Sequence, residues 1–134
     1  MNASLSKVIG SGVFFLFIFI FGFWLSRLGK PYNQILFNVH KLIGLAAFIF
    51  LIVILVQRHK LMPLRPFEIT TIVVTALIFV ATIVAGGLLS VEASGGLASL
   101  GGPVRLAITL VHKIFPYLAV LSTAVSLYLL LFRR

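Results

Sequence analysis

Four long apolar runs dominate this sequence and restrict what it can fold into. We place them near residues 8–26, 34–57, 67–90 and 105–132. Each run is roughly 18 to 25 residues long, enough to cross the ~30 Å hydrocarbon core of a bilayer as a helix. Backbone polar groups in lipid must be paired within the segment, so runs of this length indicate helices and not barrel strands. With 61% hydrophobic residues, the chain is expected to be an integral membrane protein whose solvent is lipid.

Composition excludes several other classes of protein. The chain has no cysteine, which excludes disulfides, iron–sulfur clusters and thioether-linked haem. Its net charge of +9 comes mostly from cations at the ends of the apolar runs, where Lys and Arg anchor helices at headgroups. We therefore expect no nucleic-acid partner. The cation distribution favours both termini on the cytoplasmic side, in a prokaryotic-type cell membrane.

An internal repeat relates the two halves of the chain. Val39-His40-Lys41 recurs as Val111-His112-Lys113, and the residue numbers differ by 72 (112 − 40 = 72). The same offset relates Leu25 to Leu97, Leu28 to Leu100, Gly29 to Gly101, Pro31 to Pro103 and Ala47 to Ala119. A register without gaps indicates a duplicated unit, with halves at about 1–62 and 63–134. We predict a single all-α domain: an antiparallel, up-down-up-down four-helix transmembrane bundle built from a duplicated helical hairpin.

The duplication predicts where the histidines lie. Two helices per unit return the chain to its starting side, so the pseudo-twofold axis runs along the membrane normal. The second and fourth helices are then parallel on a diagonal, and His40 faces His112 at the same depth. Gly44 lies one turn after His40, and Pro116 one turn after His112. These positions share a helix face with the histidines, and we expect Gly44 to leave room for a flat macrocycle.

Two symmetric imidazoles in a membrane bundle suit one haem with two axial histidines. A zinc site would need further ligands at that level, and no Cys, Asp or Glu is available there. We expect His40 and His112 to ligate a single haem b. His59, in the connector between the halves, has no partner for a second haem. The competing interpretation of a buried histidine is an interhelical hydrogen bond.

Cations and glycines near the histidines allow two interpretations each. Lys41, Lys113 and Arg105 could meet the haem propionates, or their side chains could extend to the headgroups. Gly22 on the first helix and Gly86-Gly87 on the third are predicted at the same depth as the histidines. They could make room for the cofactor or provide ordinary close helix packing.

The arrangement resembles the small four-helix membrane b-type cytochromes. These include the cytochrome b561 group, the superoxide oxidase-like bacterial proteins and the haem-binding halves of haem A synthase. The resemblance is carried by His40 and His112, with Gly44 and the flanking cations in support. Two-haem members carry four core histidines, whereas this chain carries two, which implies one haem.

The resemblance also implies a function. An electron-transfer protein is expected, and as an enzyme it would be an oxidoreductase acting on quinone or superoxide. Its candidate partners are a membrane quinol, a partner redox protein and a second copy of the chain. The alternatives are a haem-handling or assembly subunit of a larger membrane complex, and a cofactor-free helical subunit or transporter.

Overall fold

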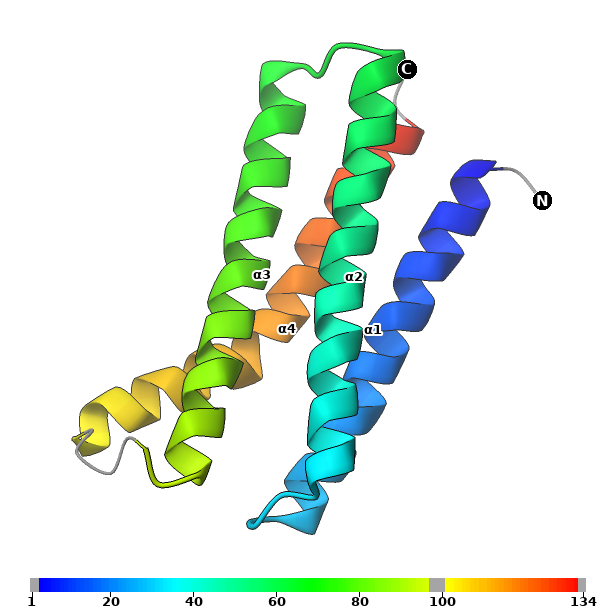
Figure 1. Ribbon diagram of the computed structural model, residues 1–134. Coiled ribbons are helices and arrows are strands. Elements are labelled where there is room, and N and C mark those ends of the chain that lie inside the picture. The colour runs from blue at the N-terminus through cyan, green and yellow to red at the C-terminus, as the bar shows by residue number, and fades with distance from the viewer. Residues whose placement is uncertain (1–2, 97–100, 133–134) are drawn as a thin grey trace.

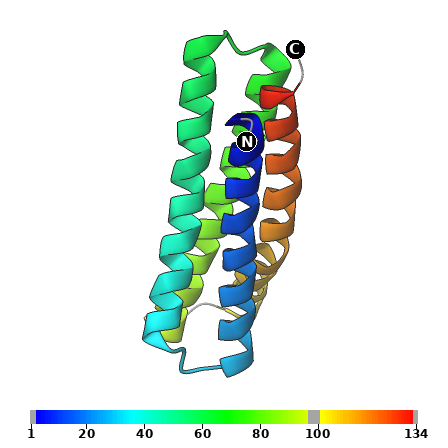
Figure 2. The same cartoon turned by 90° about the vertical axis from the view of Figure 1, so that its right-hand side faces the viewer.

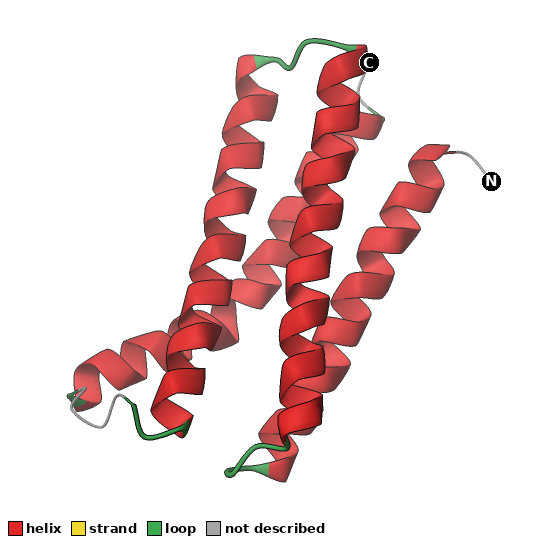
Figure 3. Ribbon diagram, viewed as in Figure 1, coloured by secondary structure: helices red, strands yellow, loops and turns green. Residues whose placement is uncertain are grey.

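The computed structural model describes residues 3–96 and 101–132, which form four helices and no strand (Figures 1 and 3). They are α1 (Ala3–Leu28), α2 (Gln34–Leu61), α3 (Pro66–Ala93) and α4 (Gly102–Leu131). All of these helices are long and apolar enough to cross a membrane. The predicted spans fall within them except for residue 132, so the predicted all-α transmembrane bundle is confirmed.

The helices run alternately up and down. The start of α1, the end of α4 and the connection from α2 to α3 lie at one end of the bundle, and the other ends of the helices lie together at the opposite end (Figures 1 and 2). We call this opposite end the histidine end, because His40 lies near the start of α2 and His112 lies in the first half of α4. α1 ends before Gly29, which has a φ of 71° and so suits the left-handed stop position of a helix. The side chain of Asn33 caps α2, because its oxygen accepts hydrogen bonds from the backbone N–H groups of Ile35 and Leu36.

Each hairpin is packed more closely within itself than against the other. α1 lies along α2 and α3 lies along α4, with sparser contacts between the hairpins. A buried cluster joins all of these helices: Phe15, Ala47, Phe79 and Ala119. The rings of Phe15 and Phe79 are 5.8 Å apart, centroid to centroid. The cluster thus contains one Phe and one Ala from each hairpin.

Two different offsets relate the halves in space. The numbers of Ala47 and Ala119 differ by 72 (119 − 47 = 72), as the sequence repeat predicts, but those of Phe15 and Phe79 differ by 64 (79 − 15 = 64). The register without gaps therefore holds between α2 and α4 and does not extend to α1 and α3. Gly29 and Gly101 also differ in role, since Gly29 follows α1 whereas Gly101 is the N-cap of α4. The predicted partners Leu97 and Leu100 lie outside the described residues.

Pro116 bends α4 just beyond His112. A proline inside a helix removes the hydrogen bond to the carbonyl four residues earlier and kinks the chain. That carbonyl belongs to His112 (116 − 4 = 112). In Figure 1 the yellow N-terminal part of α4 runs at a clear angle to its orange and red remainder. The segment that carries His112 is therefore turned relative to the rest of the bundle.

Candidate functional site

His40 and His112 lie together between the two hairpins. Their ring centroids are 6.3 Å apart and their planes are nearly perpendicular, at 84°. Both residues are half-buried. The structure thus brings together the two residues that the sequence repeat singled out, one from each hairpin.

Each imidazole packs against a glycine of its own hairpin. A Cβ added at Gly22 would lie 3.1 Å from Cε1 of His40, and one at Gly86 would lie 2.7 Å from Cε1 of His112. The numbers of these two glycines differ by 64 (86 − 22 = 64), the offset found for the Phe pair. Gly87 does not share this role, because a Cβ there would meet nothing within 4 Å. Of the two adjacent glycines that the sequence offered, Gly86 is the one at the site.

The two imidazoles differ in hydrogen bonding. Nδ1 of His112 lies 3.2 Å from the carbonyl oxygen of Thr82 on α3. A carbonyl only accepts, so Nδ1 carries the proton in this bond and Nε2 keeps its lone pair. The carbonyl equivalent to that of Thr82 by the offset of the glycine pair belongs to Ile18 (82 − 64 = 18), and it is the backbone group that faces His40. Nδ1 of His40 is buried and makes no hydrogen bond within the usual distance and angle limits among the described residues.

Space is open beside Gly44, one turn along α2 from His40. A Cβ at Gly44 would meet no atom within 4 Å, although the residue itself is only half-exposed. Its equivalent on α4 is the kinking Pro116 (44 + 72 = 116).

The lysines that follow the histidines are placed differently. Lys41 Nζ donates to the hydroxyl of Ser90 on α3 at 3.0 Å and lies 4.3 Å from the ring centre of Phe37. Lys113 is exposed. The symmetry of the sequence is therefore not carried into the contacts of these two side chains.

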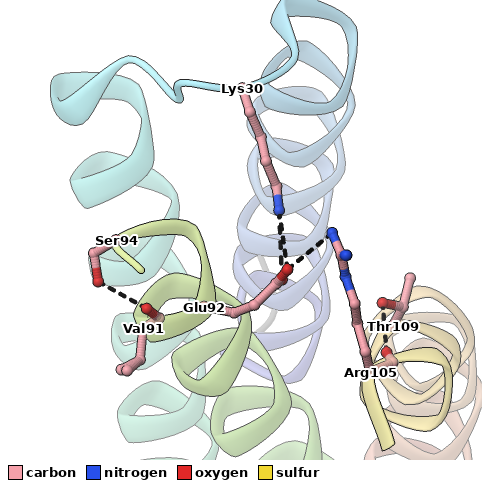
Figure 4. A network of polar contacts seen from close by, with 6 residues as sticks. All are labelled: Lys30, Val91, Glu92, Ser94, Arg105 and Thr109. Carbon is pink, nitrogen blue, oxygen red and sulfur yellow. Dashed lines mark hydrogen bonds and ion pairs between the residues drawn. The ribbon is translucent and has the colours of Figure 1, made fainter. Parts of the chain in front are cut away.

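Arg105 takes part in an ion-pair network at the histidine end (Figure 4). Its Nη2 lies 2.8 Å from Glu92 Oε1, and Lys30 Nζ lies 3.4 Å from Glu92 Oε2. Glu92, at the end of α3, has a side chain only 15% exposed. Because Lys30 belongs to the first hairpin and Glu92 and Arg105 to the second, this network joins the two hairpins. Glu92 was not among the site residues predicted from the sequence. The available signal was its rarity, since the chain has two acidic residues.

No group of three or more His, Cys, Asp or Glu side chains could hold a metal ion in the described ranges. His59 is exposed and, contrary to the expectation of a connector residue, lies in the last turn of α2. It is at the opposite end of α2 from His40.

No protein-family model, no curated protein and no solved structure matches this chain. What the protein does must therefore be inferred from the geometry of its own residues.

Proposed function

We propose that the protein is a membrane b-type cytochrome in which His40 and His112 ligate one haem b. The observation that carries this proposal is the pair of imidazoles, 6.3 Å apart between ring centroids, each supported by a glycine. A metal–imidazole nitrogen bond is about 2.0 Å long, so two imidazoles that bind the same metal ion must lie within a few ångströms of each other, as these two do.

The surroundings of the histidines support the same ligand. The bond from His112 Nδ1 to the Thr82 carbonyl is the outer contact that orients a metal-bound histidine and leaves Nε2 free for the metal. The open space beside Gly44 could accept part of a macrocycle.

A haem held by two imidazoles supplies one-electron transfer with no open position on iron for oxygen or peroxide. The protein's own residues would then orient the imidazoles, exclude water and bind reactants at the histidine end. The buried cluster around Phe15 and Phe79 separates the site from the opposite membrane face. Lys41, Lys113 and Arg105 are the candidate partners for propionates, and Arg105 would have to share its guanidinium with Glu92.

Cations at the histidine end suggest the class of reactant. Arg27, Lys30 and Arg105 lie at the histidine end and outnumber Glu92, with which Lys30 and Arg105 are paired, and an excess of positive charge attracts anions by raising the local potential. We infer an oxidoreductase that takes electrons from a membrane quinol or a partner redox protein and exchanges them with a small reactant such as superoxide. Self-association with a second copy is the remaining partner that we consider.

The proposal includes an orientation. Lys7, Arg58, Lys60 and Arg65 lie at the end where α1 begins and α4 ends, and Arg133 and Arg134 follow α4 in the sequence. The other end carries Arg27, Lys30 and Arg105, with Lys41 and Lys113 just inside the helices. We propose that the end where α1 begins is cytoplasmic, in a prokaryotic-type cell membrane, and that the histidine end faces outward. Cysteine labelling from either side of intact cells, with single cysteines introduced at each end, tests this orientation.

Absorption spectra test the haem. The purified protein is measured oxidised and then dithionite-reduced, beside His40→Ala, His112→Ala and the matched control His59→Ala. We expect a low-spin b-type spectrum that is lost in the first two variants and retained in the third. A colourless protein, or haem that survives both substitutions, contradicts the proposal. Haem that dissociates during purification favours the haem-handling alternative.

A cofactor-free helical subunit is a second candidate, favoured by one observation. The hydrogen bond from His112 to Thr82 joins α4 to α3, which is the structural role of a polar group between membrane helices. This function predicts a colourless protein that His112→Ala destabilises more than His40→Ala.

A further inference from the structure

A cavity lies between α2, α3 and α4. Relative to the buried cluster of Phe15, Ala47, Phe79 and Ala119, it is on the side away from the histidine end. It holds about 60 Å³. Its wall is mostly aliphatic and aromatic, with the polar residues Thr75, Thr123 and Ser126. Phe48, which also lines it, follows His40 by eight residues, about 12 Å along a helix. The cavity is thus distinct from the histidine site.

The hydroxyl protons on this wall can be accounted for individually. Thr75 Oγ1 donates its proton to the Thr71 carbonyl at 2.8 Å. Because that proton is used, the 3.0 Å contact between Thr75 and Ser126 must be a bond donated by Ser126. Thr123 Oγ1 is buried and has no partner in the described part of the chain. Its proton is the one left uncommitted on this wall.

The local helix explains why Thr123 remains unpaired. A helical Thr ordinarily donates to the carbonyl four residues earlier, which here is that of Ala119. The hydroxyl of Ser122 already donates to this carbonyl, at 3.2 Å. Thr123 is 2% exposed, so bulk water does not satisfy it. A buried hydroxyl without a partner is destabilising, which a ligand with an acceptor atom would relieve.

We propose that this cavity binds a neutral, membrane-soluble alkyl chain that carries one carbonyl oxygen, which accepts a hydrogen bond from Thr123. The ligand is neutral because the wall holds no charged side chain. It is a linear chain because a cavity that holds a benzene ring measures about 150 Å³, so this cavity of about 60 Å³ takes only the carbonyl end of the chain and leaves the remainder in the lipid. Ile52, on the wall, is 42% exposed, so a ligand enters from the lipid. This site does not depend on the haem.

Binding of 2-dodecanone and dodecane to the purified full chain in dodecylmaltoside tests the proposal. The variants are Thr123→Val and the matched control Thr109→Val, whose hydroxyl donates within its own helix. One hydrogen bond corresponds to about fivefold in affinity. We expect Thr123→Val to bind the ketone about fivefold more weakly, with dodecane unchanged, and Thr109→Val to behave as the wild type. Equal binding of the ketone to both variants, or no preference for the ketone over dodecane, overturns the proposal.

Two further measurements keep the test decisive. The carbonyl stretch of bound 2-dodecanone should shift to lower frequency in the wild type and not in Thr123→Val. Ala76 lines the cavity, so Ala76→Met should fill it and weaken binding of both probes. An unshifted band in the wild type, or undiminished binding to Ala76→Met, overturns the proposal even where Thr123→Val fails to fold.

Discussion

The contact between Gly86 and His112 offers the sharpest test of the histidine site. A methyl group at Gly86 would lie 2.7 Å from Cε1 and 3.1 Å from Nδ1, whereas ordinary contact begins at 3.4 Å. The His112 ring would therefore have to move until the distance from the added Cβ to its Cε1 rises from 2.7 Å to 3.4 Å. Nδ1 is held by the Thr82 carbonyl, so this movement strains or breaks a hydrogen bond.

The expected magnitude combines two opposing effects. Overpacking of this kind costs about 1–3 kcal/mol. Replacing a glycine inside a helix by alanine stabilises it by roughly 1 kcal/mol. Gly86→Ala is therefore expected to lower the free energy of unfolding by about 0–2 kcal/mol. At Gly87 an added methyl group would meet nothing within 4 Å. Gly87→Ala is therefore expected to raise the free energy of unfolding by roughly 1 kcal/mol.

The assay is unfolding in mixed micelles of sodium dodecyl sulfate and dodecylmaltoside, followed by circular dichroism. The quantity to compare is the difference in unfolding free energy between the two adjacent variants, expected at about 1–3 kcal/mol. Gly22→Ala should be milder than Gly86→Ala, since its methyl group would start 3.1 Å from the His40 ring and a smaller movement relieves the contact. If both neighbouring variants stabilise the protein equally, His112 does not pack on Gly86 and the site geometry is wrong.

Three other predictions concern the ends and the bend of the bundle. Glu92→Gln should lower stability by roughly 0.2–1 kcal/mol in low salt and less in high salt, measured by the same unfolding assay; an unchanged stability at low salt would refute a role for the network. Arg58→Met removes the bond from Nε to the Leu130 carbonyl at 2.6 Å and should cost about 1.5–3 kcal/mol, whereas Met at the exposed neighbour Lys60 should cost less. Pro116→Ala restores a backbone donor for the His112 carbonyl and should straighten α4, which distances between spin labels at its two ends would reveal as a lengthening; an unchanged distance distribution would show that the proline does not cause the bend.

Periodicity and length were sufficient to predict the helices and the meeting of His40 with His112. They were not sufficient to fix the relation between α1 and α3. The matched Gly and Pro residues lie near helix ends, where these residue types recur whatever the packing, and they carry no information on helical phase. Phe15 and Phe79 carry that information, but one ring among many on an aromatic-rich helix could not be recognised from the sequence.

Side-chain direction explains the other features of the structure that the sequence did not predict. Successive helical residues point about 100° apart, so Gly86 and Gly87 look alike in sequence and differ in space. The bridge from Glu92 to Lys30 and Arg105 depends on how three chain segments converge at one end. The unpaired hydroxyl of Thr123 depends on a local competition with Ser122 for one carbonyl. Sequence patterns predict which faces are buried, and these features depend on detailed packing within those faces.

The close packing within each hairpin suggests how a symmetric pair of histidines could arise. One hairpin already contains an imidazole and the glycine that supports it, so two copies associating about a twofold axis would place two imidazoles opposite one another. Joining the copies in one chain frees each half to mutate alone. Positions 44 and 116 now hold a glycine and a proline, and only His112 of the two imidazoles forms a hydrogen bond to a carbonyl within the usual limits. A pair of symmetric origin thereby acquires two unequal sides, and in the proposed cytochrome electrons approaching from either side would meet different surroundings.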